Sequence, residues 1–335
     1  MKFLTIGDIH IKDDNYTMRQ SFYDKLVGFL HESNNLFDHV VILGDVLDKH
    51  EKLNTTYMNE AIDLFKRIVG IIHGDLIVLV GNHDMINNQQ ICNPKGHWMY
   101  GIVIPRVVIV DKPVVIYNCV FCPYLPPSTF YDTLCSYIAE DVLKQVDGFF
   151  AHQEFIGSSM NTFLSEHGDA FDFLTDTQWV VSGHIHDRQW LKNTVDQPKI
   201  FYVGSVMQHS LGDNDRKIIA LCTFPSNPPS LTEIDLHVPT RIHKKIKPSE
   251  LESWMSVAEL HRYNKYTLSV ECSPDEFKQI KSRFKKLPDN LQIKHIPILV
   301  QVQQLPDRTK TFIEACKDVL TEHDWKYMHE IINKS

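Results

Sequence analysis

Five short polar runs contain the residues of this 335-residue chain that could carry out chemistry. They are rich in aspartate and histidine, and in chain order they read Gly7-Asp8-Ile9-His10, Gly44-Asp45, Gly81-Asn82-His83-Asp84, Ala151-His152-Gln153 and Gly183-His184-Ile185-His186. Carboxylate, imidazole and amide donors without thiolate are typical of sites that bind Mn, Fe or Zn. They are unlike the cysteine-rich ligand set of a structural zinc site. A bridging carboxylate can hold two cations about 3.5–4 Å apart, where they polarise a water and clamp both oxygens of an in-line displacement. The set therefore predicts a two-metal phosphoesterase.

Each run follows an apolar, β-branched or aromatic stretch of the kind that forms a buried strand. The stretches span residues 3–6, 40–43, 76–80, 149–150 and 179–181. A lone Asp-x-His or Gly-Asp pair is commoner as a cap or turn than as a metal ligand, so each run alone is weak evidence. Polar groups at the end of a buried strand are costly without partners. Because an open α/β sheet builds its site at strand ends, the five runs together favour metal ligation.

With these runs in this order, the chain resembles the calcineurin-like metallophosphoesterases. Within that family it is most similar to the SbcD-type nucleases, the nuclease half of the SbcC–SbcD double-strand-break repair complex, including their phage and viral counterparts. The resemblance covers residues 1–235 and extends to the blocks 152–153, 172–186, 202–205 and 212–213. It implies a metal-dependent DNA nuclease, an exonuclease or endonuclease, that acts in DNA recombination and repair.

The resemblance also implies which residues hold two divalent metal ions, with Mn²⁺ expected and Fe, Zn²⁺ or Mg²⁺ as alternatives. One ion would be held by Asp8, His10 and His186. The other would be held by Asn82, His152 and His184. Asp45 would bridge the two.

His83 is left over from this ligand set and lies between a ligand and Asp84. It is the candidate to give a proton or hydrogen bond to the leaving oxygen, with Asp84 orienting its ring; the alternatives are a further ligand or a structural residue. Three residues after Asp45, where archaeal and eukaryotic relatives tend to carry histidine, the chain has Asp48, as bacterial and phage relatives do. Asp48 could orient His83 or cap a turn. His50 is expected to be a solvated loop residue.

The predicted fold class is α/β: a four-layer αββα metallophosphoesterase sandwich with a small α+β capping domain and a C-terminal helix. Helical spacing predicts helices over 17–32, 55–69 and 128–145, the second behind a threonine cap. Further strands are expected at 106–110, 114–117, 120–122, 200–203, 217–224 and 231–236. The length suits a nuclease domain over 1–237, a basic capping or DNA-binding domain over 238–306 and a C-terminal segment over 307–335.

Charge changes along the chain at the same boundary. Residues 1–235 contain 17 Lys and Arg against 29 Asp and Glu, whereas residues 236–306 contain 12 against 7. The basic segment could neutralise DNA phosphates, although a Lys-rich run can also be a solvated helix face. A strand at 266–270, a helix at 274–284 and a strand at 293–302 resemble the small cap that helps DNA reach the metals in SbcD-type nucleases. The predicted DNA contacts are Lys244, Lys245, Lys247, Lys281, Arg283, Lys285 and Lys286.

The resemblance further implies two protein partners. A helix over 308–332 with a broad apolar arc would grip the coiled coil of an SbcC-like ATPase, or would pack on its own domain. The chain has no Gly-Lys dipeptide and hence no P-loop, so any ATP dependence would come from that partner. The helices near the N-terminus would build a homodimer, with Tyr57 among the exposed candidates.

The 7 cysteines are odd in number and scattered, which indicates a reducing compartment. The C-x-x-C formed by Cys119 and Cys122 is expected to be a strand feature. Without a signal peptide or long apolar run, the chain is expected to be soluble and intracellular, with no membrane contact, in the cytoplasm, at a nucleoid or replication site, or in an infected host cell. Two alternatives to the nuclease function stay open. One is a phosphoprotein phosphatase or a small-molecule or cyclic-nucleotide phosphodiesterase of the same fold. The other is a scaffolding or DNA-binding subunit with a dispensable metal site.

Overall fold

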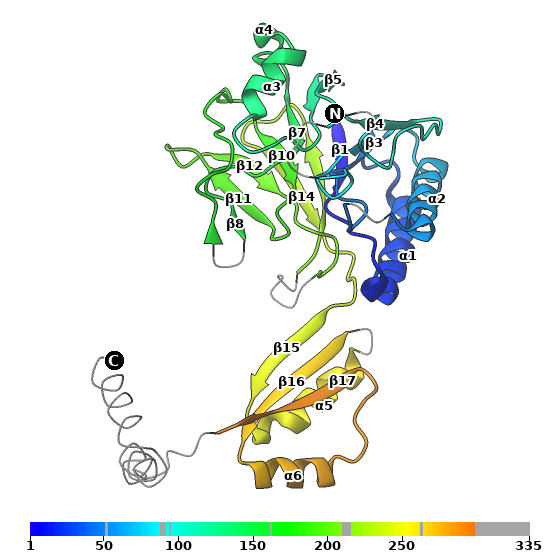
Figure 1. The fold of residues 1–335 in the computed structure, drawn as a ribbon, viewed down its shortest axis with the longest axis vertical. Helices are drawn as coiled ribbons and strands as arrows, with labels where there is room; N and C mark the ends of the chain where they lie inside the picture. The colour runs from blue at the N-terminus through cyan, green and yellow to red at the C-terminus, as the bar shows by residue number, and fades with distance from the viewer. Residues whose placement is uncertain are drawn as a thin grey trace, which may run out of the picture.

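The computed structural model describes residues 1–298 apart from 51–52, 88–91, 94, 161–162, 210–215 and 262–263. The strands form two six-stranded sheets, a three-stranded sheet and a two-stranded hairpin. The two large sheets and their helices make one body, and the three-stranded sheet lies beside it (Figure 1). The mixed α/β class predicted from the sequence is confirmed. The predicted helix over 308–332 and the block 212–213 lie outside the described residues.

The first large sheet has the strand order β14-β13-β1-β2-β3-β4. Its parallel strands are β1 (Lys2–Ile6), β2 (His39–Ile42), β3 (Leu76–Leu79) and β4 (Val107–Val110). The strands β13 (Ile219–Thr223) and β14 (Ser230–Ile234) extend it in antiparallel fashion. The helices α1 (Tyr16–Ser33) and α2 (Thr55–Ile71) pack on one face, where Phe22 and Phe65 join the cluster that contains Leu4 and Ile6.

The second large sheet has the order β11-β12-β10-β7-β6-β5. Its parallel strands are β6 (Cys119–Phe121), β7 (Gly148–His152), β10 (Val180–Gly183) and β12 (Pro198–Tyr202), and its antiparallel edges are β5 (Val114–Ile116) and β11 (Gln189–Lys192). The helices α3 (Phe130–Tyr137) and α4 (Glu140–Leu143) pack on it through Leu134 and Leu143. The smaller elements of the body are the 3₁₀ turn η1 (Asp13–Asn15) and the hairpin of β8 (Ser159–Met160) and β9 (Phe163–Leu164).

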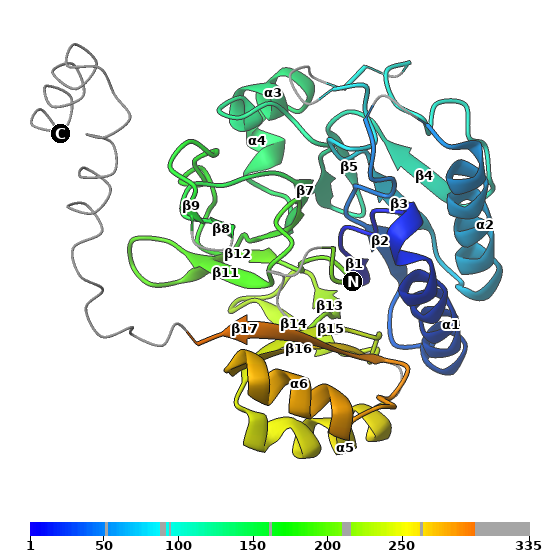
Figure 2. The ribbon, with the colours of Figure 1, turned by 60° about the horizontal axis from the view of Figure 1, so that its bottom comes forward.

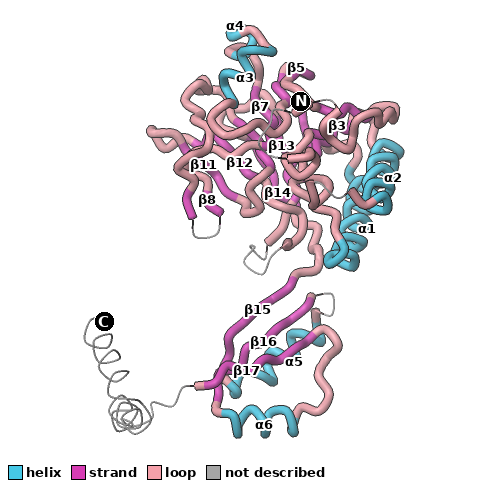
Figure 3. The backbone as a smooth tube through the Cα atoms, in the orientation of Figure 1, coloured by secondary structure: helices cyan, strands magenta, loops and turns pink. Residues whose placement is uncertain are grey.

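An aromatic cluster fills the space between the two large sheets. Side chains alternate between the faces of a strand, so Leu4 and Ile6 of β1 face the helices while Phe3 faces the other sheet. The ring centroid of Phe3 lies 4.9 Å from that of Phe150, which stacks on Phe121 at 4.7 Å. In Figure 3 the helices of this body lie on its outer sides. The sheets therefore meet through their apolar faces.

The third sheet consists of the parallel strands β15 (Arg241–Ile246), β16 (Lys265–Cys272) and β17 (Leu291–Pro297). The 3₁₀ turn η2 (Pro248–Glu250) and the helices α5 (Leu251–Leu260) and α6 (Pro274–Arg283) accompany it, with Leu268, Val270 and Ile280 in its buried core. Figure 2 shows both α-helices on the side of this sheet turned away from the large sheets. The predicted boundary near residue 238 falls in the loop before β15, and the capping role stays a prediction.

Several local features differ from the sequence prediction. The helix expected over 128–145 is two helices, because Ile138 and Ala139 are extended, and this break leaves Ile138 buried in the same cluster as Leu134. The cap of α2 is Asn54, whose side chain accepts a hydrogen bond from the N–H of Thr56 at 2.8 Å. The strand β15 and the helix α5 were not predicted, because the lysines and exposed apolar side chains there obscure the periodicity.

The six cysteines in the described part of the chain are free, Cys119 and Cys122 included. Cys119 begins β6 and Cys122 follows that strand, so the C-x-x-C is a strand feature as expected. Among the helices of the described residues, none is both long and apolar enough to cross a bilayer.

Arg19 ties the loop before α1 to both helices of the first sheet. Its buried guanidinium donates to Glu60 Oε1, Asn15 Oδ1 and the carbonyl oxygen of Lys12, each at 2.5 Å. It also lies 5.6 Å from the ring centroid of Tyr57. The predicted exposure of Tyr57 is therefore wrong: this ring is half-buried and covers a cation.

Replacing Arg19 with methionine should lower the free energy of unfolding by about 3 kcal/mol, because Glu60 would be left as an unpaired charge. The control Arg67→Met removes an exposed ion pair with Asp24 at 3.9 Å, which should cost less than about 1 kcal/mol. Urea denaturation followed by circular dichroism measures both. Equal losses in the two variants would contradict the structural role given to Arg19.

Candidate metal centre

Five loops that follow parallel strands meet where the two large sheets come together. The strands β1, β2 and β3 lead into residues 8–10, 45 and 82–84, β7 ends at His152, and β10 leads into residues 184–186. The strand ends are level within each sheet, since Ile6 pairs with Ile42 and His152 pairs with Gly183. The five strands expected before the polar runs are confirmed, and the runs themselves converge.

The backbone is strained at three of the predicted ligands. His10, Asp45 and His184 have positive φ angles of 46°, 50° and 80°, in a region that non-glycine residues adopt rarely. Gly81 lets the third loop approach the second, because a Cβ atom there would lie 2.2 Å from Asp45 Oδ1. Such conformations persist only where surrounding contacts hold them, and they are commonest at functional sites.

Asp8, His10 and His186 form the first group of donors. The Nε2 atoms of His10 and His186 are 3.0 Å apart, and one donor atom from each of the three residues lies within 4.8 Å of the others. The backbone N–H of His184 donates to Asp8 Oδ1 at 2.8 Å. Asp8 Oδ2 is buried and has no hydrogen-bond partner among the described residues. Because a buried carboxylate oxygen is costly without a partner, this atom is suited to a cation.

Asn82, His152 and His184 form the second group. Asn82 Oδ1 lies 3.0 Å from His152 Nε2 and 2.9 Å from His184 Nδ1. His152 donates from Nδ1 to the carbonyl oxygen of Leu43 at 2.6 Å. This bond fixes the tautomer and leaves Nε2 directed at the other donors.

Asp45 lies between the two groups. Its Oδ2 atom is 3.5 Å from Nε2 of His10 and 3.3 Å from Nε2 of His152. Its Oδ1 atom accepts a hydrogen bond from the backbone N–H of His83 at 2.8 Å. One carboxylate thus contacts a residue of each group, which is the position that a bridging ligand would need.

Burial and charge set the protonation states of the donors, and for three of these residues the resulting state is the one that metal binding requires. Burial lowers the pKa of His10 well below its usual value, and burial together with His152 lowers the pKa of His184 to about 3. Burial also opposes the charge of His152, but the Asp45 carboxylate raises the pKa of this ring to about 9. Despite burial, His152 and then His10 hold the pKa of Asp45 well below its usual range. His10 and His184 are therefore neutral and Asp45 is ionised, as ligands must be, whereas His152 is held charged beside Asp45 and would have to release a proton to bind a metal.

The donor set fits divalent cations. Three overlapping groups of donor atoms lie within 4.8 Å, two of which contain Asp45. Their carboxylate and imidazole atoms, with the amide oxygen of Asn82 beside them, are donors that Mn, Fe and Zn accept. The unsatisfied oxygen of Asp8 lies in one of these groups.

A cavity opens at the centre, and His83 lines it. Contrary to the prediction, the ring of His83 is not oriented by Asp84. The ring donates from Nδ1 to the carbonyl oxygen of Asp48 at 2.6 Å. The carboxylate of Asp84 instead accepts from the backbone N–H groups of Val46, Leu47 and Gly81 at 3.0–3.2 Å and from Trp98 Nε1 at 2.7 Å. Asp84 therefore holds the second loop against the third, because a buried carboxylate gains most from several N–H donors.

Asp48 contacts both the metal ligands and the predicted proton donor. Its Oδ1 atom lies 3.5 Å from His10 Nδ1 and 3.1 Å from Lys12 Nζ, and its carbonyl oxygen holds His83. The predicted solvation of His50 is wrong, because its ring stacks on that of His83 with centroids 4.4 Å apart and its Nδ1 atom is buried. The loop after β2 thus contacts His83 from two sides.

Two more side chains lie at the centre although no motif predicts them. The ring centroid of His209 lies 4.8 Å from that of His10 and 5.3 Å from that of His186. The ring of Tyr124 lies 5.6 Å from that of His184. The sequence signal for His209 is its position shortly after the block 202–205, which the family resemblance includes.

The predicted DNA contacts divide between two elements of the third sheet. All are exposed, and they are Lys244, Lys245 and Lys247 in and after β15, and Lys281, Arg283, Lys285 and Lys286 in and after α6. Ile246 is buried under the helices, so Lys245 and Lys247 face the opposite side of the sheet. The helix α6 lies on the far side from the large sheets (Figure 2), and Arg283 at its end pairs with Glu252 at 2.5 Å. The structure separates these two groups.

Comparison with known proteins places the chain among phosphoesterases. A family model described as calcineurin-like phosphoesterase matches residues 1–188. The chain is similar to two proteins named "Putative phosphoesterase". One is 078R of Invertebrate iridescent virus 3, 38% identical over 242 residues that are 70% of this chain and 66% of that protein. The other is 244L of Invertebrate iridescent virus 6, 36% identical over 242 residues that are 71% of this chain and 80% of that protein.

A solved structure of a hypothetical protein from Thermus thermophilus matches 70% of this chain and all of that chain, with a TM-score of 0.34 and 12% identity. This likeness is too low to bear on the fold. The aligned part of the chain spans only 66% of the first viral relative, so the properties of that whole protein are not transferred.

Asp45→Ala should lose most bound metal, because it removes the carboxylate that lies between the two donor groups, whereas His83→Ala should retain it. Inductively coupled plasma mass spectrometry measures the manganese bound per protein in the two variants after loading with Mn²⁺ and desalting. Circular dichroism controls for folding. Equal metal loss in both folded variants would refute this division of roles.

Proposed function

The chain belongs to the calcineurin-like phosphoesterase family, which is metal-dependent, and from this premise we propose that it is a DNA nuclease that uses two divalent ions, with Mn²⁺ as the native metal. The observation that carries the proposal is the carboxylate of Asp45, which lies within 3.5 Å of a histidine from each of the two donor groups, beside an open cavity of about 250 Å³. Its setting would be DNA recombination and repair.

The reaction is hydrolysis of a phosphodiester. The bound ions would supply Lewis acidity to the phosphoryl oxygens. His83 lines the cavity together with His184 and His186, and its Nδ1 atom is engaged with the carbonyl of Asp48. With Nδ1–H held by this bond, the imidazolium form of the ring carries a second proton on Nε2, which it would give to the departing sugar oxygen. Asp48 and His50 would keep the ring in place for that step.

A polyanionic substrate is supported by the basic face of the third sheet. Lys245 and Lys247 face away from the helices of that sheet, and Lys294 pairs in register with Ser269 beside Lys245. Lys245 is paired with Glu271 at 2.9 Å, so Lys247 and Lys294 supply the excess positive charge of this face. The large sheets belong to an acidic region, so phosphate contacts would come from this basic face. We assign DNA contact to Lys245 and Lys247 of the β15 group, because Lys244 shares the strand face of Ile246 and the α6 helix lies on the far side.

The wider assembly is part of the same proposal. The two large sheets with helices on their outer faces would form the four-layer sandwich, and residues 238–306 would act as the cap over it. An SbcC-like ATPase partner and a homodimer through the N-terminal helices rest on the family resemblance alone.

The purified chain should degrade end-labelled DNA with Mn²⁺ and lose this activity in EDTA. His83→Ala should reduce the rate by about 10²–10⁴-fold, the range that general acid–base catalysis contributes. Denaturing gels of single- and double-stranded substrates measure cleavage. Rapid hydrolysis of para-nitrophenyl phosphate, with no cleavage of DNA or of the bis-ester, would instead establish the phosphatase alternative.

Replacing Lys245 and Lys247 together with glutamine should weaken DNA binding and flatten its salt dependence. The slope of log affinity against log salt should fall by about 0.9 for each lost contact to duplex phosphate. The matched control, Lys281→Gln with Lys285→Gln on and after α6, should leave the slope nearly unchanged. Fluorescence anisotropy at several salt concentrations measures both, and a larger effect in the α6 pair would reverse the assignment.

A further inference from the structure

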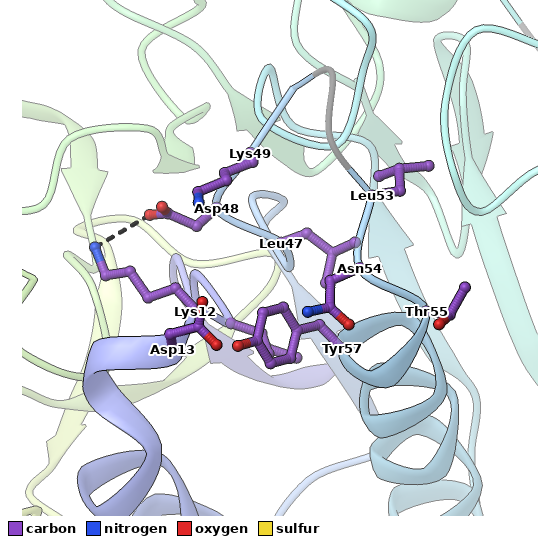
Figure 4. A pocket seen from close by; sticks show the side chains of 10 residues that line it. Lys12, Asp13, Leu47, Asp48, Lys49, Leu53, Asn54, Thr55 and Tyr57 are labelled. Carbon is purple, nitrogen blue, oxygen red and sulfur yellow. Dashed lines mark hydrogen bonds and ion pairs between the residues drawn. The ribbon is translucent and has the colours of Figure 1, made fainter.

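A second cavity, of about 440 Å³, lies beside the metal centre. Figure 4 shows its walls, which come from the loop after β1, the loop after β2 and the first turn of α2. Its volume falls in the range of about 300–1,000 Å³ that small-molecule sites occupy.

The cavity and the metal centre share one wall residue. Asp48 lines the cavity, while its carboxylate lies 3.5 Å from Nδ1 of His10 and its carbonyl oxygen accepts from the ring of His83. Ile11 and Leu47, also in the wall, form a parallel bridge next to the ligand loops. A group in this cavity would therefore be separated from the reacting phosphate by little more than the side chains of Asp48 and His83.

The charges around the cavity do not suit a second phosphate. Lys12 is already paired with Asp48 at 3.1 Å, and among the described residues of the lining the other cation, Lys49, is balanced in number by the carboxylate of Asp13. A phosphate site would carry a clear excess of positive groups. The ligand of this cavity should therefore be neutral overall.

The remaining walls suit a flat group that is apolar on its faces and polar at its edge. Leu47 is buried, Leu53 is 46% exposed at the rim, and the ring of Tyr57 is half-buried. Asn54 uses its Oδ1 atom to cap α2, which leaves its amide N–H groups as donors. A nucleobase has apolar faces and acceptor atoms at its edge.

We propose that this cavity binds the base of a nucleotide next to the scissile phosphate. The inference rests on the proposed function and deepens it, because it names a nucleotide diester as the substrate of the metal centre. A base held here would select nucleic acids over phosphoproteins and over small diesters without a base.

The test fills the cavity from its rim. Leu53→Trp places a bulky ring at an exposed position, and the control Leu36→Trp makes the same change at a residue that is 51% exposed, after the far end of α1. The substrates are the 5′ and 3′ para-nitrophenyl esters of thymidine monophosphate, which carry a base, and bis-para-nitrophenyl phosphate, which does not. The readout is the preference for a thymidine ester, the ratio of its kcat/KM to that of the base-free diester.

The unaltered chain should prefer at least one thymidine ester, and Leu53→Trp should reduce that preference by about tenfold, mainly through KM, as for loss of a pocket contact. Leu36→Trp should retain it. Leu53→Ala, which removes a wall without adding bulk, should also lower it, and this variant keeps the test valid if the tryptophan variant does not fold. A preference that survives both changes at Leu53, or no preference at all, overturns the base site but leaves the diesterase intact. Absence of any diester hydrolysis in the unaltered chain overturns the proposed function instead.

Discussion

The buried carboxylate of Asp45 is the contact on which the rest of the centre depends. It is 1% exposed, and such a charge is costly unless polar or charged groups surround it. His10, from the first sheet, and His152, from the second, both lie within 3.5 Å of it, and the backbone N–H of His83 binds its other oxygen. The same carboxylate therefore connects two donor groups and two sheets.

The loops around Asp45 are held in conformations that they would not adopt alone. Positive φ angles occur at three of the predicted ligands, Asp45, His10 and His184, and Asp84 holds the loop of Asp45 by accepting from the backbone N–H groups of Val46 and Leu47. The aromatic cluster between the sheets fixes the strands from which these loops depart. The geometry of the centre therefore depends on the packing of the core. Rigid strand ends suit a site with many ligands, because they fix the positions of the loops.

The features that could be predicted from sequence are local ones. Each strand and the polar run behind it are continuous in the chain, so the apolar stretch before Asp8 or Asn82 indicates both the strand and the ligand position. The role of Asp84 could not be predicted, because its partner Val46 is 38 residues away. The stacking of His50 on His83 is also a contact between loops. The strand β15 was missed because its central lysines hide the alternation that buries Ile246.

The most direct test of the account is anomalous diffraction at the manganese edge from crystals of the chain grown with Mn²⁺. The account predicts two peaks about 3.5–4 Å apart, one beside Asp8, His10 and His186, the other beside Asn82, His152 and His184, with Asp45 between them. A single peak, or two peaks of which neither contacts Asp45, would contradict it.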